Sequence, residues 1–447
     1  MCLPRCRKPV RWRKSLKCRS IMCSIWGAIA SRRGAGGGCG GAITWRPLGP
    51  IISGGRRRGS CGNWPRRWPM RIEGDWLDAA PLRAVLAMLE AAGHRGLIVG
   101  GAVRNAVMGL PVTDMDIATD ARPKRVMALA EAAGLRAVPT GLDHGTVTVV
   151  SGEEPFEITT FRRDEEADGR HAKVAFTDDL AEDARRRDFT MNALYAQGDG
   201  TVIDPVDGVA DARAGRVRFI EDAGRRIEED YLRILRFFRF NAIYGRDGLD
   251  PEALAAIAEH LDGLERLARE RVGAEMRKLL AAPEPSMSLA AMAQCGVLMR
   301  VLPGADVSAV PVLVALETHA GAPPEAMRRL ALIGGEEVED RLRLSKNETS
   351  VLRRYRDGIA AVDDPATLGY RHGAEAARDI VLLRMALGLP QPEDWPAQIR
   401  RGAGARCPVT ARDLMPEYEG AALGAKLKEI EARWIASGFT KTKEDLL

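Results

Sequence analysis

The chain has 447 residues, of which 46% are hydrophobic and 28% are charged, and this composition is typical of a globular protein of about three domains. No apolar run approaches the roughly 20 residues of a membrane-spanning helix, so such a helix is not expected. The formal net charge is +5, but residues 1–69 hold 16 Lys and Arg and no Asp or Glu, which leaves −11 for the remainder. An acidic main body can bind nucleic acid only through a local basic patch.

Residues 1–69 show no hydrophobic periodicity and lack the pattern of a folded domain. They are predicted to be either a disordered basic extension that contacts nucleic acid or an upstream region joined to the chain by a wrong start codon, with Met70 as the true start. Six of the eight Cys lie in this segment. The remainder has only Cys295 and Cys407, which is typical of a reduced cytosolic protein, so we expect a cytoplasmic location.

A strand, a glycine turn and a helix start follow one another between Leu97 and Leu110. Gly100 and Gly101 separate the apolar strand from the helical pattern, and glycine lets a backbone approach a ligand closely. The first free N–H groups of a helix point outward, which suits a phosphate group. Arg104 adds a permanent positive charge at the same place. We therefore predict that this turn binds phosphate.

Two acidic residues, Asp114 and Asp116, follow a few positions later. Residues i and i+2 of a β-strand share a face, so the two carboxylates are predicted to point to one side, with Met115 and Ile117 in the core behind them. Two hard carboxylates beside a phosphate site are what Mg²⁺ needs for phosphoryl transfer. A chance Asp-x-Asp pair on a solvated edge is the competing interpretation.

Beyond a helix predicted from Asp120 to Ala133, two strands are expected, from Thr146 to Val150 and from Phe156 to Thr160. Glu157 alternates with apolar neighbours in the second strand. It could bring a third carboxylate to the metal site, or it could be an ordinary exposed strand residue. The highly charged stretch from Arg162 to Lys173 is predicted to be a mobile loop.

A basic cluster next to buried apolar positions occupies Arg185 to Leu194. Arginine clusters bind phosphates through paired N–H donors. Asp188 and Asn192 are four residues apart, which would place them on one helix face within reach of a ribose or a triphosphate. A solvated charge patch is the alternative interpretation of this stretch.

The stretch from Glu229 to Phe240 carries one acidic and three basic residues at intervals of three: Asp230, Arg233, Arg236 and Arg239. This spacing predicts that they lie along one side of a helix whose other side packs on the core. Asp accepts from an exocyclic amine and Arg donates to a ring nitrogen or carbonyl, so together they could read base edges. An intrahelical ladder of salt bridges, each contributing on the order of a few tenths of a kcal/mol, is the competing interpretation.

The order of the predicted elements indicates an α+β protein. Strand signals are confined to residues 70–209, which are expected to form a mixed sheet with helices. Beyond them, helical patterns alternate with short Gly and Pro breaks, so residues 210–285 and 286–447 are predicted to be all-helical. The last helix is predicted from Gly420 to Ala436, with Leu, Ile and Trp side chains on one face.

Six motifs in this order resemble those of the class II tRNA nucleotidyltransferase/poly(A) polymerase family: GGAVRN, DMDIAT, HGTVTV, FEITTFRRD, RRDFTMNAL and EEDYLRILRFFRF. The resemblance is dense over residues 95–245 and extends weakly to the C-terminus. It implies a nucleotidyltransferase head related to DNA polymerase β at 70–209 and a helical neck with a nucleotide template at 210–285. A helical body and tail that bind tRNA would follow at 286–447.

The resemblance also implies a role for each candidate residue. Asp114 and Asp116 would be catalytic and would bind Mg²⁺, with Glu157 as a third candidate metal ligand. The implied nucleotide-binding residues are Gly100, Gly101 and Arg104 at the triphosphate, Arg187, Asp188 and Asn192 at phosphate and ribose, and Asp230, Arg233, Arg236 and Arg239 at the base. Among these, Asp230 and Arg233 would pair with the base of CTP or ATP.

Within the family, the segments His144–Thr146 and Glu157–Arg162 are more similar to a CCA-adding enzyme than to a poly(A) polymerase. The segment Asp168–Arg170 resembles the flexible loop needed to add the terminal A. The implied reaction adds C, C and A to a tRNA 3′ end from CTP and ATP and releases pyrophosphate. A poly(A) polymerase and a catalytically inactive RNA-binding relative are the alternatives. Asn105 replaces the usual Asp of the family: it keeps a polar side chain but lacks the charge that could orient Arg104.

Overall fold

The structure is a computed structural model that describes residues 70–164 and 174–447. Residues 1–69 and 165–173 lie outside the described residues, and so do the prediction of a basic extension and most of the predicted mobile loop. The first part of that predicted loop is not a loop, because Arg162–Asp164 form the strand β6. Among the helices in the described part, none is both long and apolar enough to cross a membrane.

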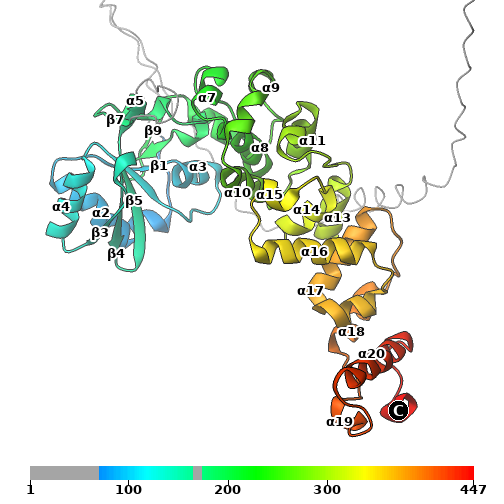
Figure 1. Cartoon of the computed structure of the whole chain (residues 1–447). Helices are drawn as coiled ribbons and strands as arrows, with labels where there is room; N and C mark the ends of the chain where they lie inside the picture. Colours follow the sequence, from blue (N-terminus) through cyan, green and yellow to red (C-terminus); the bar gives the residue numbers. More distant parts are fainter. Residues whose placement is uncertain (1–69, 165–173) are drawn as a thin grey trace, which may run out of the picture. The chain divides into compact units, whose positions relative to one another are not determined.

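The sheet region, residues 70–203, is built on a seven-stranded sheet in the order β3-β4-β5-β2-β1-β8-β9 (Figure 1). β2 and β5 run parallel and the other neighbours are antiparallel, so the predicted mixed sheet is confirmed. The strands are β1 (Gly96–Val99), β2 (Asp116–Thr119), β3 (Arg136–Gly141), β4 (Thr146–Ser151), β5 (Glu154–Thr160), β8 (Tyr195–Ala196) and β9 (Val202–Ile203). β6 (Arg162–Asp164) and β7 (Val174–Phe176) pair as a separate two-stranded sheet.

The alternation of side chains along β1 supplies two cores. Ile98 belongs to the larger core, whereas Leu97 and Val99 belong to a smaller one on the other face. The helices of this region are α2 (Ala80–Ala91), α3 (Gly101–Met108), α4 (Pro123–Ala132) and α5 (Leu180–Arg185). α2 and α4 contact each other and β4 on the face of Ile98 (Figure 1). Because both faces are covered, the polar residues near the ends of β1 and β2 are the ones placed to meet a ligand.

The helical region, residues 208–447, contains no strand, and all of its residues are described. The all-helical prediction is therefore confirmed, and the last long helix has the predicted bounds. The helices are α6 (Gly208–Ala214), α7 (Ala223–Glu229), α8 (Leu232–Tyr244), α9 (Pro251–Glu259), α10 (Arg269–Leu280), α11 (Ser286–Gln294), α12 (Val297–Val301), α13 (Val310–Ala320), α14 (Ala326–Ile333), α15 (Val338–Arg341), α16 (Lys346–Ala360), α17 (Pro365–Ala386), α18 (Trp395–Gly404), α19 (Ala411–Leu414), α20 (Gly420–Ala436) and α21 (Lys443–Leu446).

An aromatic cluster joins the sheet region to α8. The ring of Phe189 lies 5.0 Å from that of Phe219, 6.3 Å from that of Phe237 and 5.1 Å from that of Phe240, measured between centroids. Such pairs contribute about 0.5–1.5 kcal/mol each beyond the area they bury. The cluster holds the predicted phosphate-binding stretch, Arg185 to Leu194, against the helix with the predicted base-reading arginines.

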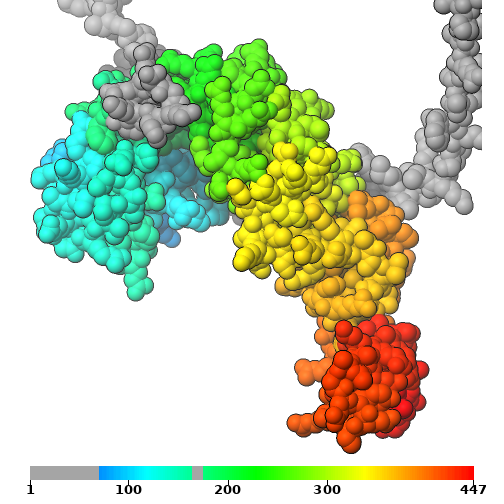
Figure 2. Space-filling view, viewed as in Figure 1, coloured from blue at the N-terminus to red at the C-terminus, as the bar shows by residue number. Residues whose placement is uncertain are grey.

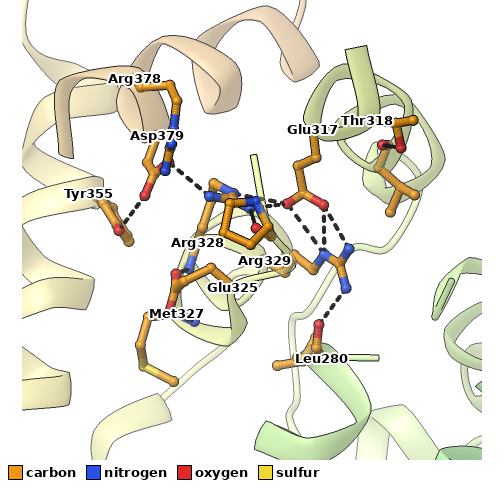
Figure 3. A network of polar contacts seen from close by, with 12 residues as sticks. Leu280, Glu317, Thr318, Glu325, Met327, Arg328, Arg329, Tyr355, Arg378 and Asp379 are labelled. Carbon is orange, nitrogen blue, oxygen red and sulfur yellow. Dashed lines mark hydrogen bonds and ion pairs between the residues drawn. The ribbon is translucent and has the colours of Figure 1, made fainter. Parts of the chain in front are cut away.

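A buried polar network joins α10 to α13, α14 and α17 (Figure 3). Arg328 and Arg329 on α14 are 0% and 1% exposed. Arg328 donates to Glu317 and to Asp379, each at 2.8 Å. Arg329 donates to Glu317 and to the backbone carbonyl of Leu280, the last residue of α10, each at 2.6 Å. Because a buried charge is costly without a partner, these contacts fix the four helices against one another.

The C-terminal residues form a third core of their own. In Figure 2 their side chains, drawn in red, pack into one cluster. The ring of Trp434 meets those of Tyr370 and Phe439 edge to face, at centroid distances of 5.6 and 5.0 Å. Because Tyr370 belongs to α17, this aromatic contact ties α20 to the preceding helices.

Candidate active site

Most of the predicted site residues line one cavity of about 470 Å³. Its walls come from the starts of α3 and β2, from the turn after α5, and from α8 and α10. The lining residues are Gly100, Gly101, Arg104, Asp116, Arg162, Arg186, Arg187, Asp188, Asn192, Asp230, Leu232, Arg233, Arg236, Phe240 and Arg271. Of the predicted residues, Asp114, Glu157 and Arg239 are not part of this lining.

A larger cavity of about 900 Å³ lies beside α7 and α9. Arg185 and Thr190 of the predicted basic stretch line it, but none of the individually predicted catalytic or nucleotide-binding residues does. Seven carboxylates and three arginines line it. An excess of negative charge repels the phosphates of a nucleotide. The charge of the lining therefore favours the smaller cavity as the nucleotide site.

The glycine turn has the geometry that a phosphate site requires. Gly100 has a φ of 70°, a left-handed conformation that favours glycine. A Cβ atom at Gly100 would lie 3.7 Å from Nη1 of Arg187 and 3.8 Å from the carbonyl oxygen of Asn192, on the cavity side. Gly101 is the first residue of α3, so the N-terminal N–H groups of this helix lie beside the cavity.

Arg104 is 6% exposed, and three uncharged side chains orient it. Nη1 donates to Oδ1 of Asn192 at 2.7 Å, and Nη2 donates to the hydroxyl of Tyr244 at 2.6 Å and to Oδ1 of Asn105 at 2.9 Å. The guanidinium also lies 4.0 Å from the centre of the Tyr244 ring. Burial lowers the pKa of Arg104. Asn105 thus takes part in orienting Arg104 without a charge, because its amide oxygen is one of the acceptors that hold the guanidinium.

The prediction that Asp114 and Asp116 share a strand is wrong. β2 begins at Asp116, and Asp114 lies in the loop before it. The reason lies in the register, since Asp116 is opposite Val99, the last residue of β1. The chain of β1 then turns into α3, so no backbone remains opposite Asp114 to extend the ladder.

Glu157 comes next to Asp116 through the sheet. The two residues are in register on the parallel strands β2 and β5. Asp116 is exposed to solvent, but the surrounding protein still desolvates its carboxylate in part and raises its pKa. The negative charges of Glu157 and Asp114 raise it further, while Arg187 opposes them. Within residues 70–164 and 174–447, none of the three carboxylates forms an ion pair. The arrangement is therefore a group of mutually repelling carboxylates at the edge of the cavity.

Asp188 and Asn192 lie together in a tight turn, and the prediction of a shared α-helix face is wrong. Phe189 is extended and forms a bridge with Phe219, which interrupts helical structure after α5. The next turn is a short 3₁₀ helix, η4 (Thr190–Asn192). Nδ2 of Asn192 nevertheless donates to Oδ1 of Asp188 at 2.9 Å, so the amide connects Asp188 to Arg104.

The side chain of Arg187 is held by two partners, so a purely solvated charge patch is excluded at this position. Nη2 of Arg187 donates to Asp183 at 3.1 Å, and Nε donates to the hydroxyl of Tyr195 at 3.2 Å. Burial lowers the pKa of Arg187, but the interactions with Tyr195 and Asp183 outweigh it and raise the pKa above its ordinary value. Arg187 is therefore a fixed cation in the cavity wall.

The four predicted base-reading residues form no ion pair with one another, so the interpretation as an intrahelical ladder is wrong. Asp230 precedes α8, and only the three arginines belong to the helix. Their ion pairs join Asp230 to Arg271 at 2.8 Å, Arg233 to Glu229 at 2.6 Å, Arg236 to Asp188 at 2.5 Å and Arg239 to Glu275 at 2.6 Å. Asp230, Arg233 and Arg236 face the cavity, whereas Arg239 is paired with buried Glu275 away from it.

The ion pair of Arg236 with Asp188 connects the helix with the predicted base-reading residues to the predicted phosphate-binding stretch. Burial disfavours the charged form of Asp188, but Arg236 and the hydrogen bond from Asn192 outweigh this cost and lower the pKa of Asp188. Asp188 is thus an ionised group that holds the two halves of the cavity together.

Sequence reasoning missed five lining residues: Arg162, Arg186, Leu232, Phe240 and Arg271. Arg162 and Arg186 lie inside the motifs quoted above. Arg162 follows the strand that carries Glu157, and Arg186 directly precedes Arg187, so the motifs could have identified both as site residues. No local pattern marks Arg271, which reaches the cavity because α10 packs against α8.

Two family models match the chain. Residues 97–218 match the poly A polymerase head domain, and residues 248–308 match the probable RNA- and SrmB-binding site of polymerase A. The mitochondrial CCA tRNA nucleotidyltransferase 1 of Mus musculus is 33% identical over 393 residues, which are 82% of this chain and 88% of that protein. The CCA-adding enzyme of Leuconostoc citreum (strain KM20) is 40% identical over 232 residues, 52% of this chain and 55% of that protein.

The fold is similar to that of the CCA-adding enzyme of Bacillus stearothermophilus in complex with CTP. The TM-score is 0.67 at 28% sequence identity, and the match covers 82% of this chain and 95% of that chain. Both the sheet region and most of the helical region are therefore shared. The chain belongs to the tRNA nucleotidyltransferase/poly(A) polymerase family, as its motifs indicated, and this family consists of nucleotidyltransferases that are in general metal-dependent.

Proposed function

We propose that this protein adds C, C and A to the 3′ end of tRNA, using CTP and ATP and releasing pyrophosphate. The observation that supports this most directly is the 470 Å³ cavity, which brings together Arg104, Asp116 and Asp230 from distant parts of the sequence. The relatives from Mus musculus and Leuconostoc citreum are named for this reaction, and the Bacillus stearothermophilus enzyme was solved with CTP.

The triphosphate is bound at the glycine turn. Gly100 and Gly101 leave room for it, and Arg104 and Arg187 supply two fixed positive charges. Because Arg104 is held by neutral partners, its charge is not cancelled by a neighbouring carboxylate in direct contact. The same two arginines stabilise the negative charge of the departing pyrophosphate.

Mg²⁺ is the proposed cofactor, with Asp114, Asp116 and Glu157 as its candidate ligands. The residues fit a divalent cation, since Glu157 and Asp114 raise the pKa of Asp116 and none of the three forms an ion pair with a described residue. No three His, Cys, Asp or Glu side chains in the described part of the chain enclose a metal by themselves. Mg²⁺ commonly takes its remaining ligands from water and substrate phosphates. When bound, the ion would neutralise charge that develops on the phosphoryl oxygens.

The base is selected by Asp230 and Arg233. Oδ1 of Asp230 accepts a hydrogen bond from the backbone N–H of Leu232 at 3.1 Å, and Oδ2 accepts from Arg271 at 2.8 Å, so the carboxylate is held in one orientation. Cytosine and adenine both present an exocyclic amine that a carboxylate accepts, while Arg233 donates to a ring nitrogen or carbonyl. Uracil presents a carbonyl oxygen in place of the amine, so the carboxylate rejects it.

The tRNA is bound by the helical body and tail at residues 286–447, which follow a neck at residues 210–285 that carries the nucleotide template. Helices of this kind hold structured RNA through its phosphates and shape, without reading its sequence. The proposed site of action is the cytoplasm. The alternative location is the mitochondrion, because the relative from Mus musculus is mitochondrial. Immunodetection of the protein after cell fractionation distinguishes the two locations.

A poly(A) polymerase is the second candidate, because the model that matches residues 97–218 is that of a poly A polymerase head domain. Incubation with a tRNA that lacks CCA and with labelled CTP separates the candidates. Incorporation of CTP supports the CCA-adding activity. Incorporation of ATP alone would identify a poly(A) polymerase, and no incorporation of either nucleotide would indicate the inactive relative.

A further inference from the structure

Asn105 connects the phosphate side of the site to the loop that carries a candidate metal ligand. Its Oδ1 accepts hydrogen bonds from Nε and Nη2 of Arg104 at 3.2 and 2.9 Å. Its Nδ2 donates to the backbone carbonyl of Pro111 at 2.8 Å. Pro111 begins the loop of residues 111–115, which contains Asp114. In the described part of the chain, this is the one side-chain hydrogen bond that joins residues 111–115 to another element. Next to it, the backbone N–H of Leu110 donates to the backbone carbonyl of Asn105 at 2.8 Å.

An aspartate at position 105 could not make both contacts. A carboxylate accepts hydrogen bonds from Arg104, but it has no N–H to donate, so one of its oxygens would face the carbonyl oxygen of Pro111. It would also place a negative charge against the guanidinium. The present partners, Asn105, Asn192 and Tyr244, are all uncharged. A buried cation with uncharged partners attracts a phosphate more strongly than one already paired with a carboxylate.

We propose that Asn105 is a positioning residue with two effects. It orients Arg104 without cancelling the positive charge that binds the triphosphate, and it holds the loop that presents Asp114 beside Asp116. This inference rests on the proposed function, in which Arg104 binds the triphosphate of CTP or ATP.

The test compares Asn105→Asp and Asn105→Ala in the full chain with the unaltered protein and with Arg104→Ala. Asn347→Asp is the control, because it makes the same change of charge. Asn347 is exposed on α16, and it is not one of the residues that line the cavity. Equilibrium dialysis without metal gives the Kd for CTP and for inorganic pyrophosphate at several salt concentrations. Hydrogen–deuterium exchange gives the protection of residues 110–116 in the absence of ligand.

Asn105→Asp is expected to weaken the binding of both ligands about tenfold, the effect of losing one charge-assisted contact. It should also reduce the salt dependence of binding, because one positive charge is cancelled. Asn105→Ala is expected to weaken binding while keeping the salt dependence, since the charge remains but is no longer oriented. Both variants should exchange faster than the unaltered protein over residues 110–116, and Asn347→Asp should change none of these quantities.

Unchanged or tighter CTP binding by Asn105→Asp, with unchanged exchange in the loop, would overturn the inference. A loss of affinity with the full salt dependence retained would also overturn the charge effect. If Arg104→Ala binds CTP as tightly as the unaltered protein, the proposed role of Arg104 fails, whatever the Asn105 variants do. The two failures are therefore distinguishable.

Discussion

Asp116 and Glu157 lie opposite each other on the parallel strands β2 and β5. Partial desolvation raises the pKa of Asp116, and the repulsion between the two carboxylates raises it further. A group whose pKa is raised by folding binds its proton more tightly in the folded chain than in the unfolded one. Its ionised form therefore costs stability at pH values above the raised pKa, and the cost disappears as the pH falls.

Replacing Glu157 by Gln is expected to raise the melting temperature of the metal-free protein by about 1 °C at pH 8 and by less at pH 5. The gain arises because one repelling charge is removed from beside Asp116. Thermal unfolding in EDTA at the two pH values measures it. Glu154→Gln, an exposed position on the same strand, is the matched control. An equal gain in the control, or a loss of stability at pH 8 in Glu157→Gln, would contradict the proposed repulsion.

Arg233 and Arg239 are expected to behave differently, although both belong to α8. Arg233 faces the cavity, so Arg233→Ala should reduce the preference for CTP over UTP about tenfold or more. Arg239 pairs with buried Glu275 outside the cavity, so Arg239→Gln should leave the preference unchanged and destabilise the fold by about 3 kcal/mol. Single-nucleotide incorporation with CTP and UTP, together with urea unfolding, checks both. Equal losses for all nucleotides in Arg233→Ala would refute its role in base selection.

Glu317 is expected to be among the most sensitive positions for stability. Glu317→Gln removes a charge that contacts Arg328 and Arg329, both buried, and should destabilise the fold by about 3–5 kcal/mol. Arg300→Gln breaks only exposed pairs and should cost less than about 1 kcal/mol. Denaturant unfolding measures both variants. A similar small effect in the two would show that the network does not stabilise the helical region.

A protein that begins at Met70 is expected to be as active as the full chain. The described fold starts there, with the carbonyl of Met70 accepting a hydrogen bond from the N–H of Val202 at 2.8 Å. All residues that line the cavity lie beyond this point. Comparison of kcat/KM for tRNA extension between the two proteins provides the measurement. A large loss in the shorter protein would mean that residues 1–69 bind tRNA or take part in folding.

Local patterns predicted much of the fold. The apolar run before Gly100 predicted β1, and the alternation around Glu157 predicted β5. The spacing of Leu, Ile and Trp side chains predicted the bounds of α20. These elements follow from short-range periodicity, which the sequence contains directly. The motifs then placed most of the cavity residues, because their order resembles that of a known family.

Other features depend on contacts between distant residues, which periodicity cannot supply. Asp114 lies outside β2 because β1 ends opposite Asp116. Asp188 and Asn192 meet in a turn because Phe189 pairs with Phe219. Arg271 enters the site only through the packing of α10 on α8. The pairing of strands and the docking of helices decided each of these positions.

In the proposed function, Asp116 and the base-reading residues act in one site that adds C, C and A to tRNA. The most direct measurement is extension of a tRNA lacking CCA, read at single-nucleotide resolution, by the full chain and by Asp116→Asn. With CTP and ATP in Mg²⁺, the unaltered protein is predicted to add three residues in the order C, C, A. The Asp116→Asn variant should be slower by about a thousandfold while still folding. Addition of A without C would rule out CCA addition, and full activity in Asp116→Asn would rule out a catalytic role for Asp116.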